Sequence, residues 1–199
     1  MRDGLRPNGP NVVSFGETGF PKGHPALDHI ESDWQTLRAG RLVPCRSEVD
    51  PRGLAAALKY AFVLEHAGTE GPIFRIAGTH ILDRFGPDIR GKQFPDLFAQ
   101  GDQQAAMEAM TAVFNEPSIV RMRLAGADGI AGSPSIAELV CLPLRDEAGG
   151  ITRAIGGFAC AQAGPIAPFS LTIAKQERQG LTGYARLPSL KAATPPART

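Results

Sequence analysis

The spacing of apolar residues changes from a helical period to a strand period near residue 59, and this change most constrains the fold. Within residues 25–39, four apolar side chains recur three or four residues apart on one helical face: Leu27, Ile30, Trp34 and Leu37. Residues 60–65 and 72–77 instead alternate, as half-buried strands do. We therefore expect an α+β fold in which helices precede an antiparallel sheet.

The helices are predicted from capping residues and apolar stripes. The first spans residues 25–39, and a second begins at Asp50, whose side chain can cap it. A short helix over 80–85 is expected to be capped by Thr79, and a longer helix covers 102–115. The stretch 171–184 is expected to form either a last helix or an irregular extension.

The strands are predicted from alternation between turn-forming segments. The first two strand segments are joined by the linker HAGTEG, which favours a β-hairpin. Three more strands are expected over 118–125, 136–144 and 153–162, separated by glycine-rich turns. The order predicts a five-stranded antiparallel sheet with helices on one face, preceded by the N-terminal helices.

Composition and charge exclude several classes of protein. Hydrophobic residues make up 43% of the 199 residues and the formal charge is +1, which is typical of a globular chain. Balanced charge argues against a nucleic-acid or membrane-surface partner, and no apolar run reaches membrane-spanning length. The three cysteines have neither disulfide-framework nor zinc-site spacing. We expect a reduced, cytoplasmic protein with no metal site.

Three stretches carry a family resemblance: WQTLRAGRLVPCRSEVDP (34–51), LKYAFVLE (58–65) and FRIAGTHILDRFGPDIRGKQFPDLF (74–98). Together with the three later strands, they resemble a stand-alone PAS-like domain family of proteobacteria, over about residues 27–163. The resemblance implies a PAS fold and a non-enzymatic sensory or regulatory role. PAS-like domains bind small ligands between the sheet and its helices, or bind proteins through the outer sheet face.

This interpretation divides the chain into four parts. They are a flexible arm (1–24), N-terminal helices (25–59), a PAS-like domain (60–163) and a largely irregular C-terminal extension (164–199). No kinase-like or cyclase-like segment accompanies the domain. An unidentified signalling protein or small molecule is therefore expected as the partner.

A ligand cavity is predicted where methionine and phenylalanine side chains would form adaptable apolar walls. Its candidate residues are His80, Phe85, Phe94, Leu97, Met107, Met110, Phe114, Met122, Phe158 and Cys160. A close-packed core without a cavity is the alternative. The sequence does not distinguish the two.

The sequence also bears on whether the protein binds a cofactor or catalyses a reaction. We expect no haem, because the helix over 102–115 lacks a histidine, and no flavin, because the cysteine motif of flavin-binding light sensors is absent. No catalytic residues are predicted. A small enzyme with a pocket on the inner sheet face is the alternative, and it would require Glu138, Arg123 and His80 to converge in that pocket.

A homodimer is predicted from the first helix. Its apolar stripe of Leu27, Ile30, Trp34 and Leu37 could form the interface, with Trp34 as a buried anchor. The alternative is that this helix packs only on the sheet of its own chain.

Overall fold

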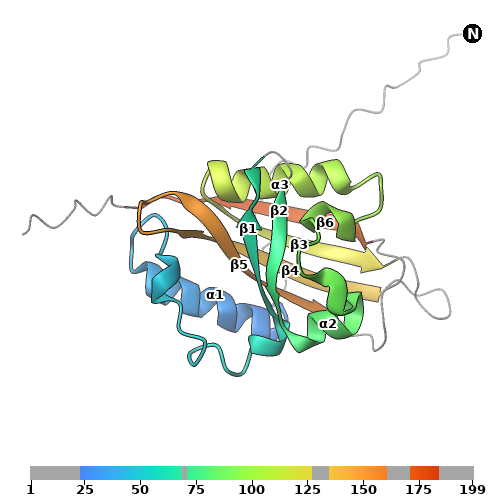
Figure 1. Ribbon diagram of the computed structural model, residues 1–199, viewed down its shortest axis with the longest axis horizontal. Helices are drawn as coiled ribbons and strands as arrows, with labels where there is room; N and C mark the ends of the chain where they lie inside the picture. The colour runs from blue at the N-terminus through green and yellow to red at the C-terminus, as the bar shows by residue number, and fades with distance from the viewer. Residues whose placement is uncertain (1–22, 69–70, 127–134, 161–170, 184–199) are drawn as a thin grey trace, which may run out of the picture.

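The computed structural model describes residues 23–68, 71–126, 135–160 and 171–183, and confirms the α+β, PAS-like fold (Figure 1). Its longer helices are α1 (Pro25–Arg38), α2 (Thr79–Phe85) and α3 (Gln103–Asn115). The strands are β1 (Ala61–His66), β2 (Pro72–Ala77), β3 (Ser118–Gly126), β4 (Ser135–Arg145), β5 (Ile151–Cys160) and β6 (Leu171–Gly180). Short 3-10 helices cover Arg46–Glu48, Leu58–Tyr60, Pro87–Ile89 and Phe94–Leu97.

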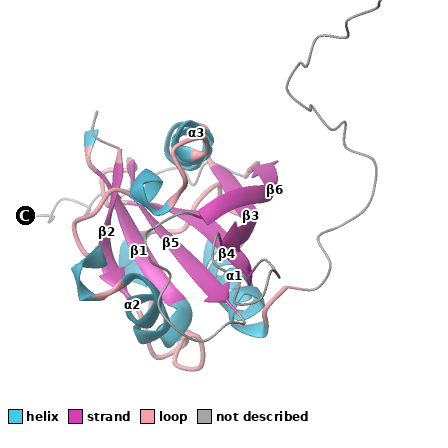
Figure 2. Cartoon of the chain, turned by 90° about the vertical axis from the view of Figure 1, so that its right-hand side faces the viewer, coloured by secondary structure: helices cyan, strands magenta, loops and turns pink. Residues whose placement is uncertain are grey.

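One antiparallel sheet organises the molecule, with the strand order β2-β1-β5-β4-β3-β6. Strand alternation separates two apolar clusters: Leu139 and Cys141 of β4 belong to the cluster that includes α2 and α3, whereas Val140 and Leu142 belong to the cluster that includes α1. We call these the inner and outer faces of the sheet. Figure 2 shows α3 and α1 on its opposite sides.

Helix α1 covers part of the outer face. Its N-cap residue His24 accepts a hydrogen bond from the backbone N–H of Ala26 at 3.2 Å, and Pro25 occupies the first helical position. The indole of Trp34 is 1% exposed and donates from Nε1 to the carbonyl oxygen of Pro143 in β4 at 2.9 Å. This hydrogen bond satisfies the indole N–H in the apolar layer.

Within the described residues, the sheet has six strands rather than the predicted five. β6 pairs with β3 along its length, where the sequence predicted a helix or an irregular extension. Because β6 is an edge strand with mostly exposed side chains, it lacks the apolar alternation that marks the other strands. Residues 164–170 and 184–199 of the predicted extension (164–199) lie outside the described residues, as do residues 1–22 of the predicted arm (1–24). Residue His24 of that arm is the N-cap of α1.

The prediction of a second N-terminal helix beginning at Asp50 is also wrong. Residues 51–57 form consecutive turns, with hydrogen bonds such as Gly53 N–H to the Asp50 carbonyl and Ala57 N–H to the Leu54 carbonyl. The Asp50 side chain accepts from the N–H of Arg52 within these turns instead of capping an α-helix. Gly53, the third residue after Asp50, weakens an α-helix at this place because glycine loses more backbone freedom than other residues. Burial of Leu54 and Ala57 on the sheet stabilises the turns instead.

The predicted cap of α2 is wrong by one residue. The N-cap is Gly78, without a side-chain hydrogen bond, and Thr79 is the first helical residue. The backbone N–H of Gly78 donates to the carbonyl of Ala61 at 2.8 Å, which ties the start of α2 to β1.

Candidate functional site

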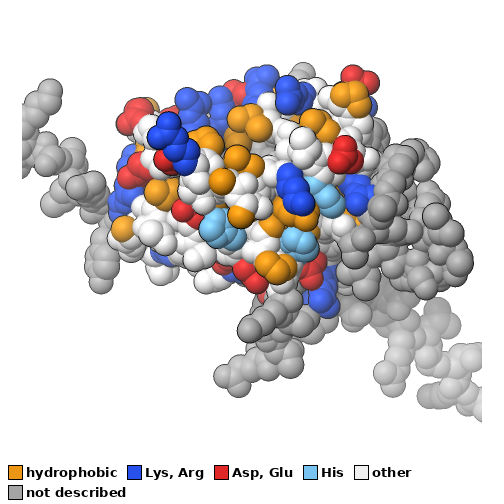
Figure 3. Space-filling view, turned by 90° about the horizontal axis from the view of Figure 1, so that it is seen from below, with side chains coloured by type: hydrophobic (Ala, Val, Ile, Leu, Met, Phe, Trp, Pro, Cys, Tyr) orange, Lys and Arg blue, Asp and Glu red, His pale blue; other side chains and the backbone are white. Residues whose placement is uncertain are grey.

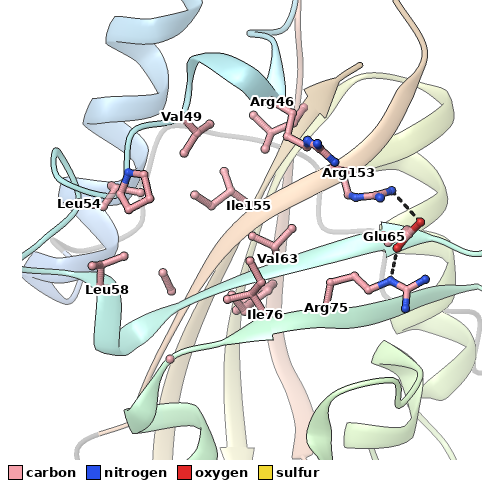
Figure 4. Close-up of a pocket in the computed structure, with 15 residues that line it drawn as sticks. Arg46, Val49, Leu54, Leu58, Val63, Glu65, Arg75, Ile76, Arg153 and Ile155 are labelled. Carbon is pink, nitrogen blue, oxygen red and sulfur yellow. Dashed lines mark hydrogen bonds and ion pairs between the residues drawn. The ribbon is translucent and has the colours of Figure 1, made fainter. Parts of the chain in front are cut away.

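A groove of about 620 Å³ lies on the part of the outer face beyond α1 (Figure 4). Val63 of β1 and Ile155 of β5 form its floor. Residues of the segment 46–58, which connects α1 to β1, line one side, and Ile76 of β2 lies on the other. The groove therefore forms between a connecting segment and an edge strand of the sheet.

The apolar part of the groove contains two large hydrophobic side chains that remain exposed. Ile76 is 57% exposed and Leu58 is 43% exposed, and both line the groove beside Val63. Single exposed apolar residues are ordinary, but apolar residues gathered in one concave surface mark interaction sites. This concentration identifies the groove as the candidate functional site.

Charged side chains occupy the end of the groove formed by the later part of β1. Glu65 accepts from Arg75 Nε, and its Oε1 lies 3.0 Å from Arg153 Nη1. Hydrogen bonding from Arg75 lowers the pKa of the Glu65 carboxyl, and the charge of Arg153 lowers it further. Arg46 lines the groove from the connecting segment. Three arginines and one carboxylate give this end a net positive charge.

Sequence reasoning missed the groove because it assumed a strict period of two in the first hairpin. The pairing of β1 with β2 shifts between Val63 and Leu64, and Arg75 and Ile76 are both exposed as consecutive residues. Such a bulge turns Ile76 to the outer face, whereas strict alternation from the buried Phe74 would have buried it. The sequence signal for this bulge is the pair Arg75–Ile76 in PIFRIA (72–77), where the isoleucine follows the arginine directly.

The structure brings together most of the predicted cavity residues. Eight of them belong to the single inner-face cluster and are at most 9% exposed: Phe85, Phe94, Leu97, Met110, Phe114, Met122, Phe158 and Cys160. Met107 is only partly buried and lines, with Met110 and Phe114, a second pocket of about 290 Å³ between α3 and the β1–β2 hairpin. Ligand binding by these residues stays a prediction.

His80 lies at the edge of the inner cluster, half-buried. Its Nε2 accepts from the backbone N–H of Cys160 at 3.2 Å, and its ring lies 4.6 Å from that of Tyr60. The Tyr60 ring is also 4.6 Å from that of His24. Figure 3 shows one face of the molecule, on which histidine side chains lie beside basic and apolar ones.

The three residues of the enzymatic alternative do not form one contacting set. Arg123 and Glu138 pair at 3.5 Å, and Glu138 Oε2 accepts from the backbone N–H of His24 at 2.7 Å. His80 is connected to this pair through the rings of His24 and Tyr60. Neither of the two pockets described above is lined by any of the three.

We expect stability to fall as the pH decreases below about 6.5. Burial lowers the pKa of His80 below its ordinary value of 6.5; the charges of Arg84, His24 and Lys59 lower it further, and Asp83 opposes them. The unfolded chain then takes up the proton first, so the free energy of unfolding declines from pH 6.5 down to the folded-state pKa.

Urea unfolding at several pH values between 5 and 8 measures this effect. His80→Gln should flatten the decline, whereas the exposed His29→Gln is the matched control and should retain it. An identical pH dependence in all three proteins would show that His80 does not contribute to it.

The predicted dimer residues lie mostly within the chain's own outer layer. Leu27, Ile30 and Trp34 are at most 6% exposed and pack on β4 and β5, whereas Leu37 is partly buried. In the single chain, α1 therefore packs on the sheet of its own chain, which was the alternative to a dimer interface. A role for this stripe in a dimer stays a prediction.

Three further properties concern the described part of the chain. Within it, no three His, Cys, Asp or Glu side chains gather in a way that could hold a metal ion. Its helices are too short or too polar to cross a bilayer. All three cysteines are buried and unpaired, and Cys45 Sγ donates to Glu147 Oε1 at 3.2 Å.

Comparisons with known proteins give one family match. A family model described as a PAS domain matches residues 22–159, which is more than half of the chain. Among solved structures, "Crystal structure of the phage VqmA-DPO complex" is similar with a TM-score of 0.35 and 12% identity. That match covers 55% of this chain and 52% of the other, so this chain spans about half the length of that relative. No curated protein sequence matches this chain.

Proposed function

This chain belongs to the PAS domain family, and on that premise we propose that it is a regulatory protein that binds a partner protein in the outer-face groove. The observation that carries the proposal is the exposure of Ile76 and Leu58 in one concave surface. Covering each of these side chains with a partner removes apolar area from water, which contributes up to about 2 kcal/mol per fully buried aliphatic side chain.

A partner bound in the groove would also affect the packing of the outer layer around α1. Its wall includes Arg46, Val49 and Leu54 from the segment that connects α1 to β1. Leu54 also belongs to the outer cluster that holds Trp34 and Ile155. A partner in the groove would therefore contact residues that pack directly on the layer formed by α1, and would favour one arrangement of that layer.

A small ligand on the inner face is the second candidate function. The pocket of about 290 Å³ supports it, because three predicted cavity residues, Met107, Met110 and Phe114, line this pocket. Its volume is near the lower limit of about 300 Å³ for small-molecule sites, so a compact ligand is expected. Native mass spectrometry of the purified protein would reveal such a ligand as a non-covalent mass adduct.

Site-specific photo-crosslinking tests the partner-binding proposal. A photo-reactive amino acid at position 76 is expected to give a discrete adduct with another protein in cells that make this chain. The matched control is position 104, because Gln104 is exposed on α3, which covers the opposite face. The proposal fails if position 76 gives no adduct, or the same adducts as position 104.

A further inference from the structure

The charged end of the groove is preorganised to receive negative charge. Glu65 contacts one guanidinium nitrogen of Arg75 and one of Arg153, and Arg153 Nη1 also donates to the Thr152 carbonyl at 3.0 Å. Each guanidinium group carries five N–H donors, so both can donate further while Glu65 holds their orientation. Counting Arg46, the charged lining has an excess of two positive charges.

The apolar and charged ends follow one strand, which sets the length of an occupant. Ala61 and Glu65, four residues apart on β1, both line the groove. At about 3.3 Å per residue, this separation is about 13 Å. A helix covers that length with about nine residues and an extended chain with about four. The occupant therefore needs apolar and acidic groups about this far apart.

The openness of the groove favours a protein segment over a small molecule. Small-ligand sites bury about 70–90% of the ligand surface. Here, Ile76 is 57% exposed and Leu58 is 43% exposed, so the apolar walls of the groove face open solvent rather than an enclosed cavity. A protein partner, in contrast, covers the rim of a groove together with its floor.

Each terminal segment of this sequence, taken as a whole, carries a net positive charge. Residues 184–199 contain Arg186, Lys191 and Arg198 and no acidic residue. Residues 1–22 contain three basic and two acidic residues. Charge complementarity therefore favours an acidic segment of another protein over these two segments.

Resting on the function proposed above, we infer that the groove binds a short acidic and apolar segment of a partner protein. Its apolar side chains lie against Ile76, Val63 and Leu58, and its carboxylates accept hydrogen bonds from Arg75, Arg153 and Arg46. Bidentate contacts between arginine and carboxylate then fix the direction of the segment along β1.

Peptide display tests this inference. A library of random 12-residue peptides is selected on the immobilised full chain, and the enriched peptides are synthesised and measured by fluorescence polarisation. We expect them to combine aspartate or glutamate with leucine, isoleucine or phenylalanine. Their affinity should fall at least tenfold with Ile76→Asp and with Arg75→Gln, and less with Arg75→Lys. Both positions are more than half exposed, so these variants should fold.

The control variant is Arg178→Gln, which removes a partly exposed arginine from β6 at the other edge of the sheet and should leave affinity unchanged. If selected peptides depend on Ile76 but lack acidic residues, the partner-binding function stands and the acidic-segment inference fails. If no peptide depends on Ile76, both fail. If Ile76→Asp instead converts a dimer into a monomer, the occupant is a second copy of this chain and the inference is overturned.

Discussion

Replacing Trp34 with alanine is expected to lower the free energy of unfolding by about 3–5 kcal/mol. The indole is 1% exposed, lies between α1 and the sheet, and belongs to the same cluster as Leu142 and Ile155. Alanine would leave a cavity in this layer and would remove the donor that pairs with the Pro143 carbonyl. Chemical denaturation monitored by circular dichroism measures the change.

Two controls separate packing from other effects of this substitution. Thr36→Ala changes an exposed residue of the same helix and should alter stability by less than about 0.5 kcal/mol. Trp34→Phe retains an aromatic ring but not the N–H donor, so it should cost less than alanine. A loss below about 1 kcal/mol for Trp34→Ala would mean that α1 does not pack on its own sheet in solution.

Gly78→Ala should cost about 3 kcal/mol although it adds a single methyl group. A Cβ atom at this position would lie 2.3 Å from the Leu58 carbonyl oxygen and 2.4 Å from the Lys59 carbonyl oxygen. Both contacts are with backbone, so the clash is relieved only if the 3-10 helix Leu58–Tyr60 moves away from the start of α2. This helix ends where β1 begins, beside the groove. Thermal unfolding measures the loss.

Gly101→Ala is the matched control for this effect. Nothing lies within 4 Å of a Cβ atom at Gly101, and no positive φ is required there. Stability should stay within about 1 kcal/mol, because alanine mainly restricts the unfolded chain. Equal effects of the two substitutions would contradict the close approach at Gly78.

These two sites support the shape of the groove in different ways. Trp34 anchors the outer layer on which Leu54 of the groove wall packs, and Gly78 lines the groove at the end of β2. Variants at either position are therefore expected to change groove binding through the shape of the site. Ile76→Asp and Arg75→Gln test binding directly, because their side chains face the groove without supporting the core.

Local sequence patterns were sufficient to predict the helices and strands that have a strong apolar period or clear flanking turns. Helix α1, the β1–β2 hairpin, α3 and strands β3 to β5 appear within about two residues of their predicted bounds. The family was also evident from the motifs of residues 34–98. The inner core was anticipated as a set, because its side chains share one face of each strand or helix.

What only the tertiary structure decided depends on contacts between distant segments. β6 pairs with the edge that β3 offers, and beyond Leu171 and Ile173 at its start its side chains are mostly exposed, so they carry no apolar alternation. Residues 51–57 form turns because Leu54 and Ala57 pack on the sheet. The groove arises because a bulge in the first hairpin turns Ile76 outward, opposite a connecting segment that lies far from it in sequence. The apolar period of a sequence indicates which residues are buried. Register shifts and edge pairing depend instead on the partner strand. The groove could therefore be located only in the folded chain.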